Sequence, residues 1–161
     1  SMLNAVMEYL SNHIAHHNGT LDKFMGDGVM AFWGAPVLME NHANDAIECA
    51  VGILADLEQL NAELDKLGLP SVRLGIGINS GQVAVGHMGS ISRKNYTCVG
   101  DVVNIASRLQ QMCSSLECNL LLGGDAAGRS HGIELVKIRD IHVKGKKNQV
   151  AVYTHLHFQP A

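Results

Sequence analysis

The chain has 161 residues, of which 47% are hydrophobic, and its formal net charge at pH 7 is −3. This length fits one domain with a sizeable core, and the slightly acidic balance offers no basic surface of the kind that binds nucleic acid. The cysteines, at positions 49, 98, 113 and 118, have the spacing of neither a metal site nor a disulfide framework, so we expect reduced thiols and a cytoplasmic domain. No apolar run approaches the roughly 20 residues of a membrane span, so no membrane contact by this segment is expected, although the parent protein could be anchored elsewhere.

The sequence predicts both helices and strands along the chain. Periodicity and stop signals predict a helix over 2–17, a hairpin over 21–33, a long helix over 40–67, strands at 72–79 and 82–87, a polar loop over 88–95, a helix from 101 to about 113, a strand at 119–122 and a strand pair between 133 and 158. We therefore predict an α+β fold in which helices pack on a mostly antiparallel sheet.

The hairpin carries the first candidate site. Two apolar runs flank Gly26-Asp27-Gly28, and an Asp-Gly step between apolar runs is typical of a tight turn. The turn would hold the Asp27 carboxylate at its tip, with Lys23 four residues earlier. Mg²⁺ binds through one or two carboxylates together with substrate phosphates, so Asp27 is a candidate metal ligand. The alternative is that Asp27 only forms the turn.

The segment 96–109 carries the second candidate site. A β-prone run ends at Gly100, and Asp101 is predicted to cap the helix that follows. Asn104 and Arg108 are four residues apart and so lie on one face of that helix. An amide beside a guanidinium can hold a ribose and a phosphate, because arginine presents a planar fork of donors to phosphate oxygens. Taken alone, an Asn/Arg pair on a helix is more often a solvated or capping pair.

Together with two further motifs, these segments resemble the catalytic domain of class III nucleotidyl cyclases, the adenylyl and guanylyl cyclases. The motifs follow the family's order and cover nearly the whole chain, at residues 19–27, 75–81, 99–108, and 143–146 followed by 150–153. Four ordered motifs are far more specific than one glycine pattern. The resemblance implies a ferredoxin-like core within a single cyclase catalytic domain over residues 1–161.

The resemblance also implies a reaction and a metal. Class III cyclases join the ribose 3′-hydroxyl to the α-phosphate and release pyrophosphate, using two Mg²⁺ or Mn²⁺ ions held by two aspartates. Asp27 matches the second of these aspartates. Lys23 matches the base-reading position, where ATP cyclases have lysine and guanylyl cyclases have glutamate. An ammonium can donate to an acceptor atom of adenine and cannot accept from guanine N–H groups, so ATP is the expected substrate.

The remaining site residues follow from the same resemblance. Thr97 lies seven residues before Asn104, at the position of the partner of the base-reading lysine. The Lys23/Thr97 pair is similar to a bacterial and soluble-type subclass of adenylyl cyclases. Asn104 matches the residue that orients the ribose, Arg108 the residue that stabilises the transition-state phosphate, and Lys144 the lysine that reaches the terminal phosphates. The alternative for Lys144 is a solvated lysine at a strand end.

In the family one chain supplies the metal aspartates and the other supplies the base, ribose and phosphate residues, so a homodimer with two shared sites is implied. The family's first metal aspartate lies on an opening strand with no matching motif in residues 1–161. We therefore expect the given segment to lack that strand and to be inactive by itself, with regulatory domains elsewhere in the parent chain. Two alternatives stay open: a guanylyl cyclase, which Lys23 disfavours, and a non-catalytic dimerisation or nucleotide-binding module, which the missing aspartate favours.

Overall fold

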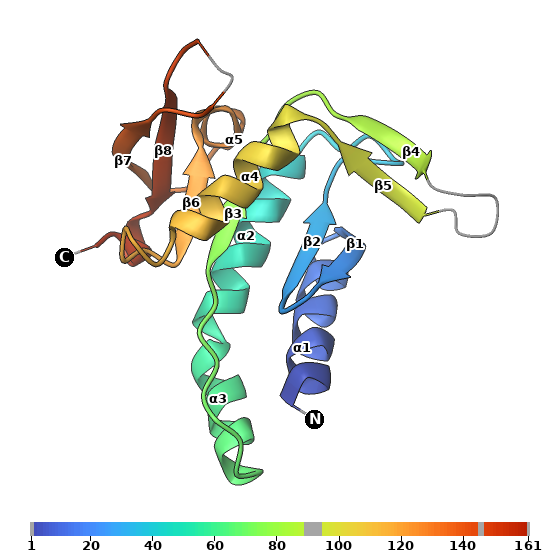
Figure 1. The fold of residues 1–161 in the computed structure, drawn as a ribbon, viewed down its shortest axis with the longest axis vertical. Helices are drawn as coiled ribbons and strands as arrows, with labels where there is room; N and C mark the ends of the chain where they lie inside the picture. Colours follow the sequence, from blue (N-terminus) through green and yellow to red (C-terminus); the bar gives the residue numbers. More distant parts are fainter. Residues whose placement is uncertain (1, 89–94, 145–146, 161) are drawn as a thin grey trace. The chain divides into compact units, whose positions relative to one another are not determined.

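The computed structural model describes residues 2–88, 95–144 and 147–160 (Figure 1). The chain divides into two compact units, the first formed by residues 1–74 and 85–97 and the second by residues 75–84 and 98–161. Most of the predicted polar loop over 88–95 lies outside the described residues, as do positions 145 and 146 of the fourth motif. The single catalytic domain over residues 1–161 stays a prediction, and each unit is taken separately below.

The first unit combines helices with a hairpin. Its elements are α1 (Met2–His16), β1 (Thr20–Met25), β2 (Gly28–Phe32), α2 (His42–Ala55) and α3 (Leu57–Lys66). The prediction of one helix over 40–67 was wrong at Asp56, which separates α2 from α3 with φ −88° and ψ 0°. Aspartate favours helix ends over helix interiors because its side chain competes for backbone hydrogen bonds.

Apolar side chains of α1 and α3 form one core cluster of the first unit. Val6 on α1 packs with Leu60 and Leu64 on α3, and all three are buried. The Tyr9 hydroxyl donates a hydrogen bond to the carbonyl oxygen of Ile53, which ties α1 to α2. Fully burying such aliphatic side chains stabilises a fold by about 1.5–3 kcal/mol each, so this packing fixes α1 on the other two helices.

The hairpin formed by β1 and β2 has the tight turn that the sequence predicts. Met25 pairs with Gly28, so the loop consists of Gly26 and Asp27. Gly26 has φ 58°, a left-handed conformation that glycine adopts without a steric penalty. Near the hairpin's base, the Trp33 indole N–H donates to the carbonyl of His17 at 2.8 Å and attaches the hairpin to the end of α1.

The second unit is built on a mixed sheet with the strand order β3-β6-β8-β7. Its elements are β3 (Ile76–Ile78), α4 (Asp101–Met112), β6 (Leu120–Gly123), α5 (Gly124–Arg129), β7 (Leu135–Ile141), β8 (Val150–His155) and a 3-10 helix (Leu156–Phe158). Strand β3 is parallel to β6, and the other neighbouring strands are antiparallel. A separate two-stranded sheet, formed by β4 (Ala84–Met88) and β5 (Asn95–Val99), belongs mostly to the first unit. The predicted α+β class with a mostly antiparallel sheet is confirmed.

Helix α4 covers the sheet of the second unit (Figure 1). Ile105 and Leu109 on its inner face pack in one buried cluster with Leu121 of β6. The expected cap at Asp101 was wrong: Asp101 is the first helical residue, and the cap position is Gly100 with φ 147°. Among the described residues, no helix is both long and apolar enough to cross a membrane.

Candidate active site

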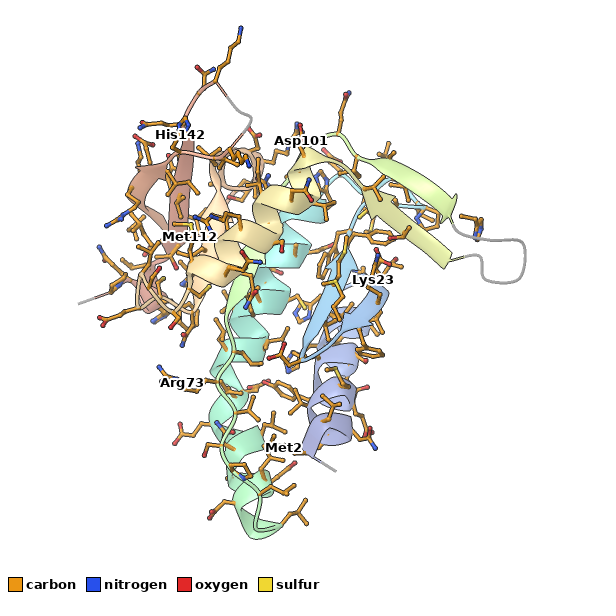
Figure 2. All side chains as sticks on the ribbon, viewed as in Figure 1. Met2, Lys23, Arg73, Asp101, Met112 and His142 are labelled. Atoms are coloured by element: carbon orange, nitrogen blue, oxygen red, sulfur yellow. The ribbon has the colours of Figure 1, made fainter. Side chains whose placement is uncertain are left out.

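Two of the predicted base-reading residues of the first unit meet at a buried carboxylate, that of Asp22. The Thr97 hydroxyl donates a hydrogen bond to Asp22 Oδ2 at 2.5 Å. The Lys23 ammonium nitrogen lies 4.0 Å from Asp22 Oδ1. The Asp22 side chain is 1% exposed, so its carboxylate is buried, whereas that of Lys23 is 46% exposed. Figure 2 labels Lys23, which lies on β1. The pair therefore presents an ammonium and a hydroxyl that share one buried anion.

A β-bulge explains how adjacent residues serve the same site. Successive side chains of a regular strand point to opposite faces, which would separate Asp22 from Lys23. In β1, however, Leu21 pairs with Ala31 while Lys23 pairs with Met30, so Asp22 is an extra residue without a partner in the register. A bulge of this kind re-aims a side chain and is frequent next to functional sites.

Asp27 lies exposed at the tip of the hairpin, where the sequence predicts it. An exposed carboxylate with open coordination fits a Mg²⁺ or Mn²⁺ ion whose other ligands come from phosphate and water. It does not fit an ion held by protein alone, because the described part of the chain contains no group of three or more histidine, cysteine, aspartate or glutamate side chains that could hold a metal. Asp27 is thus a candidate for one ligand of a substrate-linked ion.

The candidate ribose and phosphate residues lie on the outer face of α4 in the second unit. Asn104 and Arg108 are both exposed and lie one helical turn apart. Each is followed by a buried residue, Ile105 and Leu109 respectively. The apolar inner face fixes the rotation of the helix and so directs the amide and the guanidinium outward. Within the described residues Arg108 takes part in no ion pair, which leaves its donors available to a phosphate.

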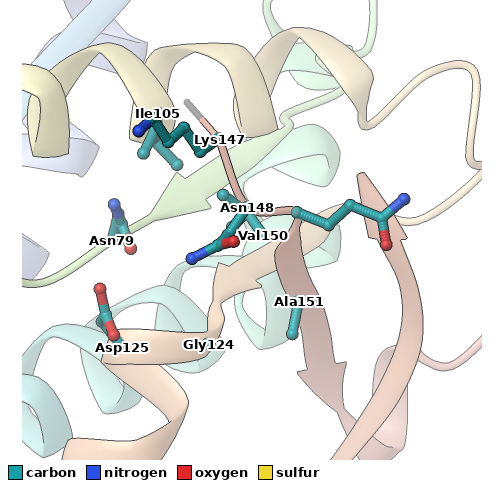
Figure 3. Close-up of a pocket in the computed structure, with 9 residues that line it drawn as sticks. Asn79, Ile105, Gly124, Asp125, Lys147, Asn148, Val150 and Ala151 are labelled. Carbon is teal, nitrogen blue, oxygen red and sulfur yellow. The ribbon is translucent and has the colours of Figure 1, made fainter. Parts of the chain in front are cut away.

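The second unit also contains a cavity that the sequence did not predict (Figure 3). Its volume is about 450 Å³, and its lining includes Asn79 at the end of β3, Asp125 on α5, and Lys147. The Asn79 amide donates to the carbonyl of Val102 at 3.3 Å, which ties the end of β3 to the first turn of α4. Lys144, the candidate for the terminal phosphates, is exposed in a turn after β7 and does not line this cavity.

The cysteines are not part of a site. All four are buried and none forms a disulfide, as the sequence predicts. Burial raises the pKa of the Cys49 and Cys113 thiols to about 11. A buried thiol of raised pKa forms little thiolate at neutral pH and is a poor nucleophile, which leaves the polar groups of β1, β5 and α4 as the candidate chemistry.

Asp22 is the site residue that the sequence analysis missed. It lies inside the motif over 19–27, but its role depends on its burial and on the bulge. Neither feature can be predicted from a periodic pattern in the sequence. The available signal was chemical: an aspartate in the middle of a β-prone run is unusual, because aspartate is depleted in strands and rarely buried without a partner.

Comparison with known proteins identifies the family of the chain. The family described as the adenylate and guanylate cyclase catalytic domain matches residues 1–156. Adenylate cyclase 1 of Rhizobium meliloti is 35% identical over 156 residues, which cover 95% of this chain and 23% of the relative. The adenylate cyclase of Anabaena cylindrica is 29% identical over 160 residues, which cover 94% of this chain and 31% of the relative.

Solved structures give the same result. The adenylyl cyclase CyaB from P. aeruginosa superposes with a TM-score of 0.87 at 29% identity, covering 96% of this chain and 80% of that one. The guanylyl cyclase Cya2 superposes with a TM-score of 0.85 at 30% identity, covering 94% and 77%. The chain thus spans less than a third of each of the two curated relatives. From its motifs, its fold and these matches, the chain belongs to the adenylate and guanylate cyclase catalytic domain family.

Proposed function

We propose that the chain is the catalytic domain of an adenylyl cyclase, which converts ATP to 3′,5′-cyclic AMP and pyrophosphate. In this reaction the ribose 3′-oxygen forms a bond to the α-phosphorus, and the bond from that phosphorus to the oxygen bridging to the β-phosphate breaks. Pyrophosphate leaves with the electron pair, and the 3′-hydroxyl proton passes to solvent. The observation that carries the proposal is the Lys23/Thr97 pair assembled around Asp22.

The chemistry of this pair matches adenine. Adenine presents an acceptor at N1 beside a donor at its 6-amino group, whereas guanine presents a donor at N1 beside an acceptor at O6. An ammonium can only donate, so Lys23 pairs with N1 of adenine and opposes N1–H of guanine. Thr97 would take the second contact, with the 6-amino group. A site with buried polar groups discriminates strongly, because the wrong base leaves them unpaired.

Ribose and phosphate recognition falls to α4 and to the turn after β7. In the proposed roles Asn104 orients the ribose, Arg108 stabilises the charge that develops on the α-phosphate, and Lys144 binds the terminal phosphates. Holding the 3′-hydroxyl in line with the phosphorus, and aiming fixed positive charge at the phosphate, are the two contributions a protein makes to phosphoryl transfer. A Mg²⁺ or Mn²⁺ ion at Asp27, when bound, would supply further charge neutralisation to the phosphates.

We further propose that the enzyme works as a homodimer with two shared sites, each combining Asp27 of one protomer with the base, ribose and phosphate residues of its partner. A two-fold symmetric dimer is the simplest assembly that gives both protomers equivalent roles. The exposure of Asp27, Asn104 and Arg108, each on the surface of its own unit, is consistent with use by a second chain.

A guanylyl cyclase is the second candidate, favoured by the similarity to Cya2. The test measures cyclic AMP formed from ATP and cyclic GMP formed from GTP by the full-length protein, with Mn²⁺ or Mg²⁺ added. A kcat/KM at least about tenfold higher for ATP is expected from the donor and acceptor pattern. Cyclic GMP as the main product would establish the second candidate, and nucleotide binding without either product would establish a non-catalytic module.

A further inference from the structure

We propose that Asp22 is a specificity-determining residue of the base site: its carboxylate holds the hydrogen of the Thr97 hydroxyl, so that the hydroxyl faces the base only as an acceptor. This inference rests on the proposed adenylyl cyclase function and assigns the selection of adenine over guanine to three residues instead of two. Asp22 acts through Thr97 and does not itself contact the nucleotide, so it is a positioning residue.

With Asp22 ionised, the hydrogen bond between Thr97 and Asp22 has one possible direction. A hydroxyl carries one hydrogen and two acceptor lone pairs, whereas an ionised carboxylate can only accept. The distance of 2.5 Å between Thr97 Oγ1 and Asp22 Oδ2 is that of a short, charge-assisted O–H···O⁻ bond. The hydroxyl hydrogen is therefore committed to Asp22, and only lone pairs of Thr97 remain for a ligand.

Burial keeps this arrangement from being exchanged with water. Thr97 is 5% exposed, and the Asp22 side chain is 1% exposed. Asp22 Oδ1 is buried and has no hydrogen-bond partner among the described residues, and the Lys23 nitrogen at 4.0 Å is beyond hydrogen-bond distance. A carboxylate oxygen left in this state costs stability, since burying a charged group without full pairing is unfavourable. Fold stability therefore does not explain why a carboxylate is buried here, whereas a role in positioning Thr97 and Lys23 does.

The consequence for base selection follows from the rotation of the hydroxyl. A threonine hydroxyl that is free to turn can accept from the 6-amino group of adenine or donate to O6 of guanine, and so tolerates both bases. With its hydrogen held by Asp22, Thr97 can accept from the amino group and can offer only lone pairs to O6. Lys23 thus contacts N1 of the base, and Asp22 prevents the Thr97 hydroxyl from turning to donate to O6 of guanine.

The experiment is a double-mutant cycle on substrate preference in the full-length protein. Asp22→Leu replaces the carboxylate by an apolar side chain of similar shape, and Thr97→Val removes the hydroxyl. The quantity measured is the ratio of kcat/KM for ATP to kcat/KM for GTP, in which the amount of folded enzyme cancels. Asp22→Leu is expected to lower this ratio by about tenfold or more in the wild-type background. In the Thr97→Val background the same substitution is expected to change the ratio by less than about threefold, because Asp22 acts through the Thr97 hydroxyl, which is then absent. Independent effects would instead add, and the change would be the same in both backgrounds.

Two results would overturn the inference and leave the proposed function intact. One is an Asp22→Leu enzyme that loses activity toward ATP and GTP equally. The other is an effect on the ratio that is as large with Val at position 97 as with Thr. Asp22→Ala serves as a second variant, with thermal unfolding measured on both, so that a folding defect in one does not decide the result. A wild-type protein that prefers GTP, or that makes neither cyclic nucleotide, would refute the proposed function, and this inference with it.

Discussion

Lys23 keeps its donors available although a buried carboxylate lies next to it. The 4.0 Å between its nitrogen and Asp22 Oδ1 is within ion-pair range and too long for a hydrogen bond. Asp22 thus attracts the ammonium group without occupying its N–H donors. With 46% of its side chain exposed, Lys23 can turn toward a base. An arginine in this place would bind a carboxylate through a planar fork, which makes lysine the better choice for a single acceptor atom.

Reversing this charge is expected to lower ATP turnover. In Lys23→Glu the donor to adenine N1 is replaced by a carboxylate, which also lies beside the buried Asp22 carboxylate. The kcat/KM for ATP is expected to fall on the order of 100-fold, the loss that follows from leaving a polar partner in the site unpaired. Lys66→Glu, the same charge change at an exposed residue of α3, is the control and should stay within about twofold, as surface substitutions usually have small effects. Full ATP activity in Lys23→Glu would contradict the assignment of the base site.

The resemblance to the cyclase family indicated Lys23 and Thr97 as candidate base-reading residues, but it did not indicate the residue that lies between them. A motif match indicates which side chains are candidates for a functional site. It does not show that β1 contains a bulge, and without the bulge Asp22 would be expected on the face opposite Lys23. The sequence therefore identifies the two residues that would face the base and misses the buried group behind them.

At the scale of elements, β3 holds α4 in place through a close approach of backbones. A Cβ atom on Gly77 would lie 2.3 Å from the carbonyl oxygen of Ala106 and 2.5 Å from the amide nitrogen of Gln110, distances that no side chain tolerates. Only glycine allows the strand and the helix to touch here. The bond from Asn79 to Val102 fixes the start of the same helix. The helix that carries Asn104 and Arg108 is thus positioned by a strand of only three residues.

A methyl group at this contact is expected to destabilise the fold. Gly77→Ala must separate β3 from α4, and overpacking of this kind typically costs about 1–3 kcal/mol, occasionally more. Urea unfolding of the second unit's sheet, followed by circular dichroism, measures the loss. Gly128→Ala on α5 is the matched control, because a Cβ there meets nothing within 4 Å and alanine is favoured over glycine in a helix by about 0.5–1 kcal/mol. Equal unfolding midpoints for the two variants would show that the close approach is not what holds α4.

The predicted element boundaries agree with the structure where hydrophobic periodicity determines them. They differ from it where the backbone conformation of a single residue determines them. Helix α4 and the buried strand β6 were predicted to within about a residue or two, since their apolar faces set them. The break at Asp56 and the cap at Gly100 were missed. At each of these positions one backbone conformation outweighs the surrounding periodic pattern.

At the scale of the whole molecule, the proposed shared sites assign Asp27 and Arg108 to opposite sides of a dimer. Both side chains are exposed, on the hairpin of the first unit and on α4 of the second, so neither contributes to a core. Substituting either one is expected to leave folding almost unchanged, because surface changes away from caps and networks usually alter stability by less than about 0.5 kcal/mol. Loss of activity in such variants would therefore report on the site itself.

The last prediction is a complementation between two inactive enzymes. Asp27→Ala and Arg108→Ala are each expected to abolish cyclic AMP formation in the full-length homodimer, since every site then lacks one group. After subunit exchange about half of the dimers are mixed, and each mixed dimer keeps one intact site of two, so about a quarter of wild-type activity should return. A mixture of Asn104→Ala with Arg108→Ala is the control, because both residues belong to the same side and no intact site can form. If the first mixture stays inactive while exchange is demonstrated, or if the control mixture recovers activity, then Asp27 and Arg108 do not act across a dimer as proposed.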